Sequence, residues 1–368
     1  MIKIDPRRLW QQLTANVDSL LLSFLLMLMM IGLVVLYSAS GQDLGKTTSQ
    51  MINMLVALSL MWGVAKVPPQ HLARLALPAY AAGLLLLLGV MLFGEVSHGA
   101  RRWLHIGVTR IQPSEIMKLA VPLMLAWFLD KREKTLNLKD YGIAALLLVV
   151  PVGLILKQPD LGTSLLITAS GFYVLFLAGL SWRIILGLAG LFALSAPILW
   201  SLMHDYQRQR ILTLLDPSQD PLGAGYHIIQ SSIALGSGGV FGKGWLNGTQ
   251  AHLDFLPERT TDFIFAVFSE EFGLAGNLIL LALFLLVIGR GMVIAAKAPT
   301  LFSRLLAGSL TLTFFTYAFV NMGMVSGILP VVGVPLPLIS YGGTSMVTLL
   351  LGFGMLMSIQ THRKLVQS

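Results

Sequence analysis

The chain has 368 residues, of which 55% are hydrophobic and only 11% are charged, and its mean hydropathy is +0.78. Soluble domains carry about 25% charged residues, so this composition excludes an ordinary soluble enzyme and predicts a single membrane domain over residues 1–368. The sequence contains no Cys, which excludes disulfides, thiol nucleophiles and thiolate metal sites.

The net charge of +8 does not indicate a nucleic-acid partner. The Lys and Arg residues are scattered between apolar runs, whereas nucleic-acid-binding proteins gather them on one face. Anionic membrane lipids and membrane topology explain this distribution better.

Ten apolar windows are long enough to cross a bilayer, which takes about 20 mostly apolar residues. They centre near residues 28, 58, 86, 122, 148, 170, 192, 276, 314 and 352. The first window is too long for the apolar region of a signal peptide, so we expect an uncleaved first span. The sequence therefore predicts an all-α, polytopic membrane protein of about ten transmembrane helices.

The basic residues orient these helices, because cytoplasmic loops are enriched in Lys and Arg. With residues 1–18 as a cytoplasmic tail, most basic residues fall on the cytoplasmic side, and an even number of spans returns the C-terminus there. The longest non-apolar stretch, residues 204–261, then becomes a large extracytoplasmic loop between the seventh and eighth spans. Within it, residues 223–235 have the pattern of a short interfacial helix.

Charged residues stand at the entrance of the eighth span: Glu258, Arg259 and Asp262. An ionisable residue beside an apolar helix is a candidate functional residue. The alternative is that Thr261 or Asp262 only caps the helix, as Ser, Thr, Asp and Asn commonly do. The residues alone leave both interpretations open.

A second charged cluster opens the fourth span. Pro113 suits the first turn of a helix, and Glu115 and Lys118 then share one face because they are three residues apart. We expect these two side chains to pair within the membrane. An internal salt bridge that fixes this helix against a neighbour is favoured over a direct catalytic role.

Basic residues on the predicted outer side are candidates for binding an anionic headgroup. Arg101, Arg102 and Arg110 precede the fourth span, and guanidinium groups suit phosphate, although general lipid contact is the alternative. Asp160 opens the sixth span, and Arg208 and Arg210 close the seventh. For these three residues, helix capping and solvation compete with a binding role.

Two glycine- and proline-rich segments predict close backbone approach. Residues 236–244, with Lys243, lack the spacing and flanking strand of a phosphate loop, so we expect a turn that approaches a neighbouring helix or a ligand. Residues 330–343 contain three Pro residues before the tenth span. Non-helical backbone at membrane depth is tolerated inside protein or at a wet cavity, which predicts a re-entrant cavity wall.

These stretches together resemble the SEDS family of shape, elongation, division and sporulation proteins. The resemblance covers nearly the whole chain and rests on residues 99–103, 112–118, 158–163, 206–210, 223–245, 255–271 and 321–343. It implies a ten-helix peptidoglycan glycosyltransferase of the bacterial inner membrane that polymerises lipid II into glycan. It also implies a partner, a class B penicillin-binding protein that cross-links the strands.

The resemblance assigns roles to particular residues. Asp262 matches the essential acid of the family, and Glu115 and Lys118 match its buried charge pair. The Pro257-Glu258-Arg259 sequence and the short N-terminal tail favour the branch that serves cell elongation over the division branch. One departure is Thr260, because the family often has His at this position.

Glycan polymerisation needs a base for the attacking sugar hydroxyl and positive charge for the departing diphosphate. We expect Asp262 to be this base or a ligand of a divalent cation such as Mg²⁺, which prefers oxygen donors. The substrate-binding candidates are Arg101, Arg102, Arg110, Asp160, Arg208, Arg210, Lys243, Glu258 and Arg259. A helix N-terminus and Arg259 would lower the pKa of Asp262, whereas burial would raise it.

Two other functions compete with this prediction. Intramembrane charges and broken helices also mark the substrate paths of transporters, so the chain could be a flippase for lipid II. The charged motifs gather on one side and no inverted repeat is evident, which favours the enzyme. A scaffold for a wall-synthesis complex would leave Asp262 and the outer Arg residues without a function.

Overall fold

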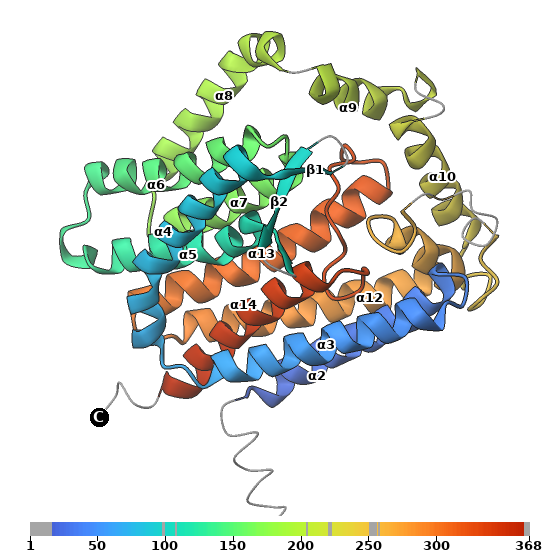
Figure 1. Ribbon diagram of the computed structural model, residues 1–368, viewed down its shortest axis with the longest axis horizontal. Coiled ribbons are helices and arrows are strands. Elements are labelled where there is room, and N and C mark those ends of the chain that lie inside the picture. Colours follow the sequence, from blue (N-terminus) through green and yellow to red (C-terminus); the bar gives the residue numbers. More distant parts are fainter. Residues whose placement is uncertain are drawn as a thin grey trace, which may run out of the picture.

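The computed structural model describes residues 17–97, 100–106, 109–203, 205–219, 223–249, 256 and 258–363. Most of the predicted 1–18 tail therefore lies outside the described residues. Within them the chain is mainly helical, and most of its long helices lie side by side in one bundle (Figure 1).

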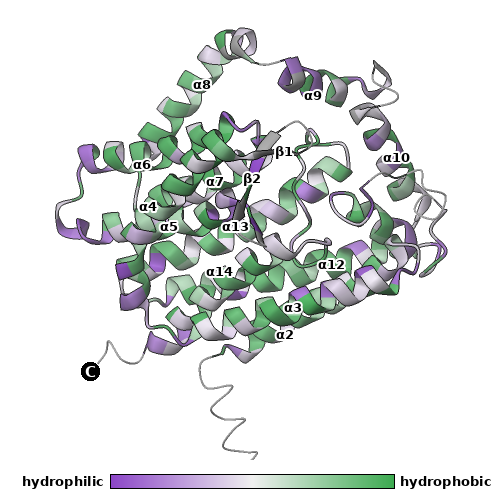
Figure 2. Cartoon of the chain, viewed as in Figure 1, coloured by the Kyte–Doolittle hydropathy of each residue, from purple (hydrophilic) through white to green (hydrophobic). Residues whose placement is uncertain are grey.

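Each of the ten predicted apolar windows falls on a helix. These helices are α2 (Ser19–Ala39), α3 (Leu44–Ala65), α4 (Pro69–Phe93), α5 (Pro113–Asp130), α6 (Leu138–Leu156), α7 (Leu161–Leu177), α8 (Trp182–Leu202), α12 (Ile264–Ala296), α13 (Leu301–Val325) and α14 (Gly343–Thr361). Among the described helices, seven are long and apolar enough to cross a membrane, namely α2, α3, α4, α6, α12, α13 and α14. Their hydrophobic residues run along the helices and the hydrophilic ones gather near the helix ends (Figure 2).

Helix α13 occupies the centre of the bundle, where it packs against α5, α7 and α12. Its side chains are buried along most of its length. Polar side chains on a buried helix need hydrogen-bond partners within the protein. Several hydroxyl groups of α13 donate to backbone carbonyls, and Ser309 Oγ donates to Ser170 O on α7 (2.7 Å).

A small antiparallel sheet connects α4 to α5, and the prediction of an all-helical chain missed it. Its strands are β1 (Glu95–Ser97), β2 (Ala100–Ile106) and β3 (Thr109–Ile111), in the order β1-β2-β3. Val96 pairs with Arg101, and Leu104 pairs with Ile111. Strands this short carry too little periodicity to be recognised beside long apolar helices. The sheet matters because β2 carries Arg102.

Between α7 and α12 the chain leaves the bundle and returns through an arch of helices (Figure 1). Helix α8 is exposed along almost its whole described length. It is followed by α9 (Asp205–Leu215), a short turn of 3-10 helix η2 (Pro217–Gln219) and α10 (Ala224–Ser237). Helix α10 confirms the helix expected over residues 223–235, and it packs back against α12.

The glycine-rich segment 236–244 is joined to a break in α12 by backbone hydrogen bonds. The break lies at Gly273, whose φ is 64°. Lys243 N and Gly244 N donate to the carbonyls of Glu270 and Glu271, while Leu274 N and Ala275 N donate to carbonyls of the segment. These donors are therefore used by α12, and the prediction of close approach to a neighbouring helix is confirmed.

Replacing Gly242 by Ala should disrupt this junction. A Cβ atom there would lie 2.0 Å from the Glu271 carbonyl oxygen, at a φ of +77°. The positive φ costs about 1–2 kcal/mol for a residue with a Cβ atom, and overpacking adds about 1–3 kcal/mol. We expect a clear fall in the thermal unfolding temperature in detergent.

Gly239 provides the matched control. It also has a positive φ, +55°, but a Cβ atom there would meet open space. The Gly239→Ala variant should therefore lose only the backbone contribution. Equal destabilisation of the two variants would show that the junction is not tightly packed.

Candidate active site

Asp262 lies in a turn that precedes α12 and does not cap the helix. The N-cap residue is Phe263, and no side chain makes a cap hydrogen bond there. The turn closes on the carbonyl of Glu258, which accepts bonds from Thr261 N (3.1 Å) and Phe263 N (3.2 Å). The interpretation of Thr261 or Asp262 as a simple helix cap is therefore wrong.

Three successive carbonyls of this turn are bonded by residues from the C-terminal part of the chain. Thr260 O accepts from Tyr341 N (2.9 Å), and Thr261 O accepts from Ser340 Oγ (2.6 Å). Asp262 O accepts from Asn321 Nδ2 (2.8 Å). These three hydrogen bonds fix the backbone that carries Asp262, and their donors are distant from it in the sequence.

The non-helical segment between α13 and α14 forms a wall against Asp262. Gly333, with a φ of +73°, comes so close that a Cβ atom there would lie 3.4 Å from Asp262 Oδ2. On the other side, a Cβ atom at Gly162 of α7 would lie 2.6 Å from Val332 O. The segment therefore fits between the start of α7 and Asp262, as expected for a re-entrant wall.

A polar cavity of about 250 Å³ opens beside this wall. Its size is close to the lower end of the range of about 300–1,000 Å³ that is usual for ligand sites. Charged and neutral polar side chains from distant parts of the chain line it: Arg102, Gln112, Glu115, Lys118, Asp160, Thr163, Thr261, Asp262, Tyr341, Thr344 and Ser345. The cavity therefore combines acids, bases and hydroxyl groups in one place.

The surroundings of Asp262 suit a base that works near neutral pH. Burial raises the pKa of its carboxyl group to about 6, the negative charge of Glu258 adds to the rise, and the charge of Arg210 opposes it. Burial therefore outweighs the neighbouring positive charge, which answers the question that the sequence left open. A carboxyl group with such a pKa is ionised at neutral pH yet accepts a proton readily.

Glu115 and Lys118 form an ion pair on the wall of the cavity. Lys118 Nζ lies 2.5 Å from Glu115 Oε1, and the two side chains are 7% and 12% exposed. Helix α5 begins at Pro113, as the proline pattern suggests, so the pair lies in its first two turns. The same lysine lies 5.2 Å from the centre of the buried Tyr317 ring on α13.

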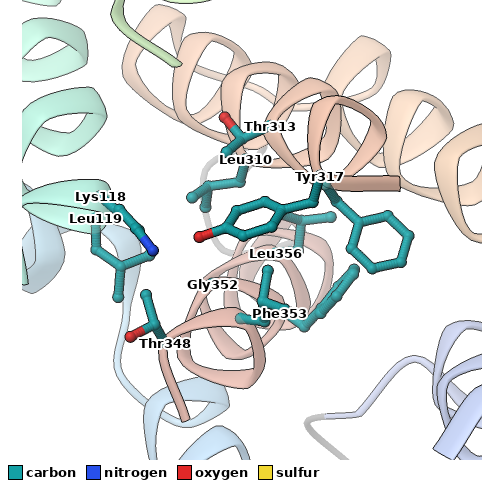
Figure 3. A pocket seen from close by; sticks show the side chains of 11 residues that line it. Lys118, Leu119, Leu310, Thr313, Tyr317, Thr348, Gly352, Phe353 and Leu356 are labelled. Atoms are coloured by element: carbon teal, nitrogen blue, oxygen red, sulfur yellow. The ribbon is translucent and has the colours of Figure 1, made fainter. Parts of the chain in front are cut away.

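Lys118 also lines a second, more apolar and much smaller cavity of about 30 Å³ between α5, α13 and α14. Figure 3 shows the Tyr317 hydroxyl pointing towards the Lys118 ammonium group, with Leu310, Phe353 and Leu356 lining the apolar part. Lys118 therefore separates a polar space from an apolar one.

Arg102 and Asp160 meet at the edge of the polar cavity. Arg102 Nη2 donates to Pro159 O (2.9 Å), and Arg102 Nε lies 3.8 Å from Asp160 Oδ2. Asp160 also caps α7 by accepting a bond from Thr163 N (3.2 Å). Both residues were predicted from the sequence, and for Asp160 the capping and cavity positions coexist.

Arg210 and Glu258 are not among the residues that line the polar cavity, but their charges act on Asp262. The remaining predicted substrate-binding residues lie away from the cavity. Arg208 bonds the carbonyls of Trp200 and Ser201. Lys243 Nζ lies 2.6 Å from the buried Glu270. Arg110 is exposed on β3, Arg259 lies beside Gly41, and the side chain of Arg101 is outside the described part.

No sequence pattern identified Asn321, Ser340 or Tyr317 as a site residue. Each is a common residue type whose role depends on a partner that is distant in the chain. The proline and glycine residues of 330–343 indicated a non-helical wall but not which side chains would bind the turn before α12. The motif 321–343 included Asn321 and Ser340 without assigning them contacts.

Comparisons with known proteins agree with these features. The family model FTSW_RODA_SPOVE, described as cell cycle protein, matches residues 18–365. Peptidoglycan glycosyltransferase MrdB of Escherichia coli strain K12 is 54% identical over 363 residues, which are 98% of each chain. Peptidoglycan glycosyltransferase RodA of Treponema pallidum is 32% identical, and the match covers 95% of this chain and 98% of the relative.

Two solved structures share this fold. A chain reported under "Structural coordination of polymerization and crosslinking by a peptidoglycan synthase complex" has a TM-score of 0.81 and 36% identity, covering 94% of this chain and 98% of that chain. The rod shape determining protein RodA of Thermus thermophilus has a TM-score of 0.72 and 32% identity, covering 94% of this chain and 97% of that chain.

Removing one charge of the Glu115 and Lys118 pair should destabilise the protein strongly. The Glu115→Gln or Lys118→Met variant leaves a buried charge without its partner, which costs about 3–5 kcal/mol. The double variant leaves no charge and should lose less than the sum of the two. Exchanging the two residues should also preserve folding better than either single change.

Thermal unfolding of the four variants in detergent measures these effects. The pair of Asp205 and Arg208 has the same spacing, but the Asp205 side chain is fully exposed, so Asp205→Asn should change the unfolding temperature little. Strictly additive losses at Glu115 and Lys118 would show that the two charges do not stabilise each other.

Proposed function

The chain belongs to the FtsW/RodA/SpoVE family, and we propose that it polymerises lipid II in the polar cavity with the Asp262 carboxylate as the general base. It is a peptidoglycan glycosyltransferase of the type that serves cell elongation. The observation that carries the proposal is geometric: the partly buried Asp262 side chain lines one cavity together with Lys118 and Arg102. Burial also raises the pKa of its carboxyl group to about 6.

The reaction joins two sugars and releases a lipid diphosphate. The 4-hydroxyl oxygen of the acceptor N-acetylglucosamine attacks the anomeric carbon of the donor, and the bond from that carbon to the diphosphate oxygen breaks. Asp262 takes the proton of the attacking hydroxyl, a contribution of about a hundredfold to ten-thousandfold in rate. The electron pair of the broken bond leaves with undecaprenyl diphosphate.

Positive charge on the cavity wall supports the departing diphosphate. Arg102 presents a guanidinium group, which binds phosphate oxygens in a planar fork, and Lys118 presents an ammonium group. Arg210 on α9 is close enough for its charge to act on Asp262. Preformed positive groups stabilise negative charge as it develops on the leaving group.

A divalent cation is a second part of the proposal. Within the described residues, no group of three or more His, Asp and Glu side chains could hold a metal ion. The negative charge of Glu258 raises the pKa of Asp262, and Mg²⁺ often binds one or two protein carboxylates together with substrate phosphates. These two residues would hold a cation that neutralises the diphosphate.

The order of the helices supports a proposed membrane arrangement. We place ten spans, α2 to α8 and α12 to α14, in the bacterial inner membrane with both termini in the cytoplasm. The starts of α5, α7 and α12 and the wall between α13 and α14 then fall on the periplasmic side. All four contribute to the polar cavity, which supports an active site facing the periplasm.

A class B penicillin-binding protein is the proposed partner. The similar solved chain belongs to a peptidoglycan synthase complex that coordinates polymerisation with cross-linking. A nascent glycan strand made at the periplasmic cavity would pass directly to such a transpeptidase.

The Asp262→Asn variant tests the catalytic assignment. The amide cannot accept the proton, so we expect glycan synthesis from labelled lipid II by the reconstituted protein to fall at least about a hundredfold. Equal polymer from variant and wild type would contradict the role of Asp262. Labelled lipid that changes leaflets without forming polymer would support a flippase.

The stability of Asp262→Asn separates catalysis from folding. A carboxyl group whose pKa is raised by burial destabilises the folded state as the pH rises from the ordinary pKa of 3.8 to about 6, and the loss is complete above pH 6. Removing the charge should therefore leave the unfolding temperature unchanged or higher at neutral pH. A lower unfolding temperature would indicate a structural role for the carboxylate.

The rate should depend on the ionisation of Asp262. Because the base works in its deprotonated form, kcat/KM should rise through about pH 6 and level off above it. A pH series of initial rates with saturating and limiting lipid II measures this dependence. A flat profile between about pH 5 and 8 would contradict a base with this pKa.

Chelation tests the cation. We expect excess EDTA to lower the polymerisation rate and Mg²⁺ to restore it, because the diphosphate would lose its counter-charge. Full activity in EDTA would remove the cation from the proposal and leave the base role of Asp262 in place.

A further inference from the structure

Asn321 connects the two backbone segments that face the Asp262 carboxyl group. It lies near the C-terminal end of α13 and is completely buried. Its Nδ2 atom donates to Asp262 O (2.8 Å) and to Val334 O (2.7 Å). One carbonyl belongs to the turn before α12, and the other belongs to the wall, next to Gly333. The spacing between the carboxyl group and its wall therefore depends on this side chain.

The chemistry of an amide fits this position better than that of other side chains. Asn carries two N–H donors on one nitrogen, whereas Asp carries none when ionised and Ser carries one. Asn321 Oδ1 is buried and has no hydrogen-bond partner within the described residues. Buried acceptors are seldom left unpaired, so this arrangement indicates that the two donors are what the site requires.

Helix α13 reaches both charged parts of the cavity from one face. Tyr317 precedes Asn321 by four residues, a spacing that places both on the same side of a helix. The Tyr317 hydroxyl points towards Lys118 (Figure 3), while Asn321 holds the turn that carries Asp262. The central helix of the bundle is thus in contact with the acid and with the ion pair.

We propose that Asn321 is a positioning residue for Asp262, holding the turn and the wall at one spacing so that the carboxyl group meets the acceptor hydroxyl. The proposal rests on the function of Asp262 proposed above. Asn321 acts only through the backbone, since its donors are used by two carbonyls. A displacement of about 1 Å at a reacting group can cost about a hundredfold in rate, which is the effect that this clamp prevents.

A substitution at Asn321 leaves the charges around Asp262 in place. Glu258 lies in the same turn and Arg210 comes from α9. The remaining charged or titratable groups that line the cavity come from β2, α5, the start of α7 and the wall: Arg102, Glu115, Lys118, Asp160 and Tyr341. None of them lies on α13. Replacing Asn321 therefore loosens the clamp without removing a charge from the surroundings of Asp262.

The Asn321→Ala variant of the full chain, assayed with labelled lipid II, tests the proposal. We expect kcat to fall about tenfold to a hundredfold while KM changes less than about threefold. A fall in kcat at nearly constant KM is the result expected for a displaced reacting group, because binding of lipid II does not depend on the clamp. Asn321→Ser keeps one donor and should give an intermediate kcat.

Ser309→Ala is the matched control, because it removes a buried side-chain bond from the same helix to Ser170 O at a distance from the cavity. It should lower the unfolding temperature but leave kcat close to that of the wild type. The proposal is overturned if Asn321→Ala loses no more kcat than the control, or if its KM rises as much as its kcat falls. It is also overturned if neither Asn321 variant folds while the control does, since Asn321 would then be structural.

A failure of the underlying function would look different. If Asp262→Asn makes as much polymer as the wild type, then Asp262 is not the base and both proposals fall. If Asp262→Asn is inactive while Asn321→Ala keeps the wild-type kcat, only the positioning role is overturned.

Discussion

Backbone hydrogen bonding inside an apolar bundle is the constraint on which this structure depends. Each polar backbone group that leaves a regular helix at membrane depth needs a partner from the protein. The turn at Asp262 obtains its partners from Asn321, Ser340 and Tyr341. The break at Gly273 obtains its partners from the glycine-rich segment 236–244. The turn before α12 and the break within α12 are therefore both held by other parts of the chain.

This arrangement keeps Asp262 in surroundings that disfavour its ionised form. Burial of Asp262 penalises its charged form, and the folded state tolerates this because the surrounding backbone is held independently of the carboxyl group. The Glu115 and Lys118 pair shows the opposite case, in which two buried charges compensate each other. Active sites commonly sacrifice stability in this way for a group with the required reactivity.

Much of the fold and part of the site could be predicted from the sequence. The apolar windows located the helices, because length and hydropathy are local properties. The i, i+3 spacing identified the pair on α5, and the proline-rich segment indicated a wall. The capping alternative for Asp262 failed because cap geometry depends on where the helix starts, and Phe263 takes that position. Lys243 was predicted to bind substrate, because the sequence does not show that the buried Glu270 of α12 lies next to it and pairs with it.

The position of Lys118 links its charge to the packing of the bundle. Its ammonium group lines the polar cavity on one side and the small apolar cavity between α5, α13 and α14 on the other. A substitution that fills or enlarges the apolar cavity, for example at Leu310 or Leu356, would change the surroundings of this lysine without touching a residue that lines the polar cavity. The packing of α13 against α14 is therefore an indirect influence on a charge that the polar cavity contains.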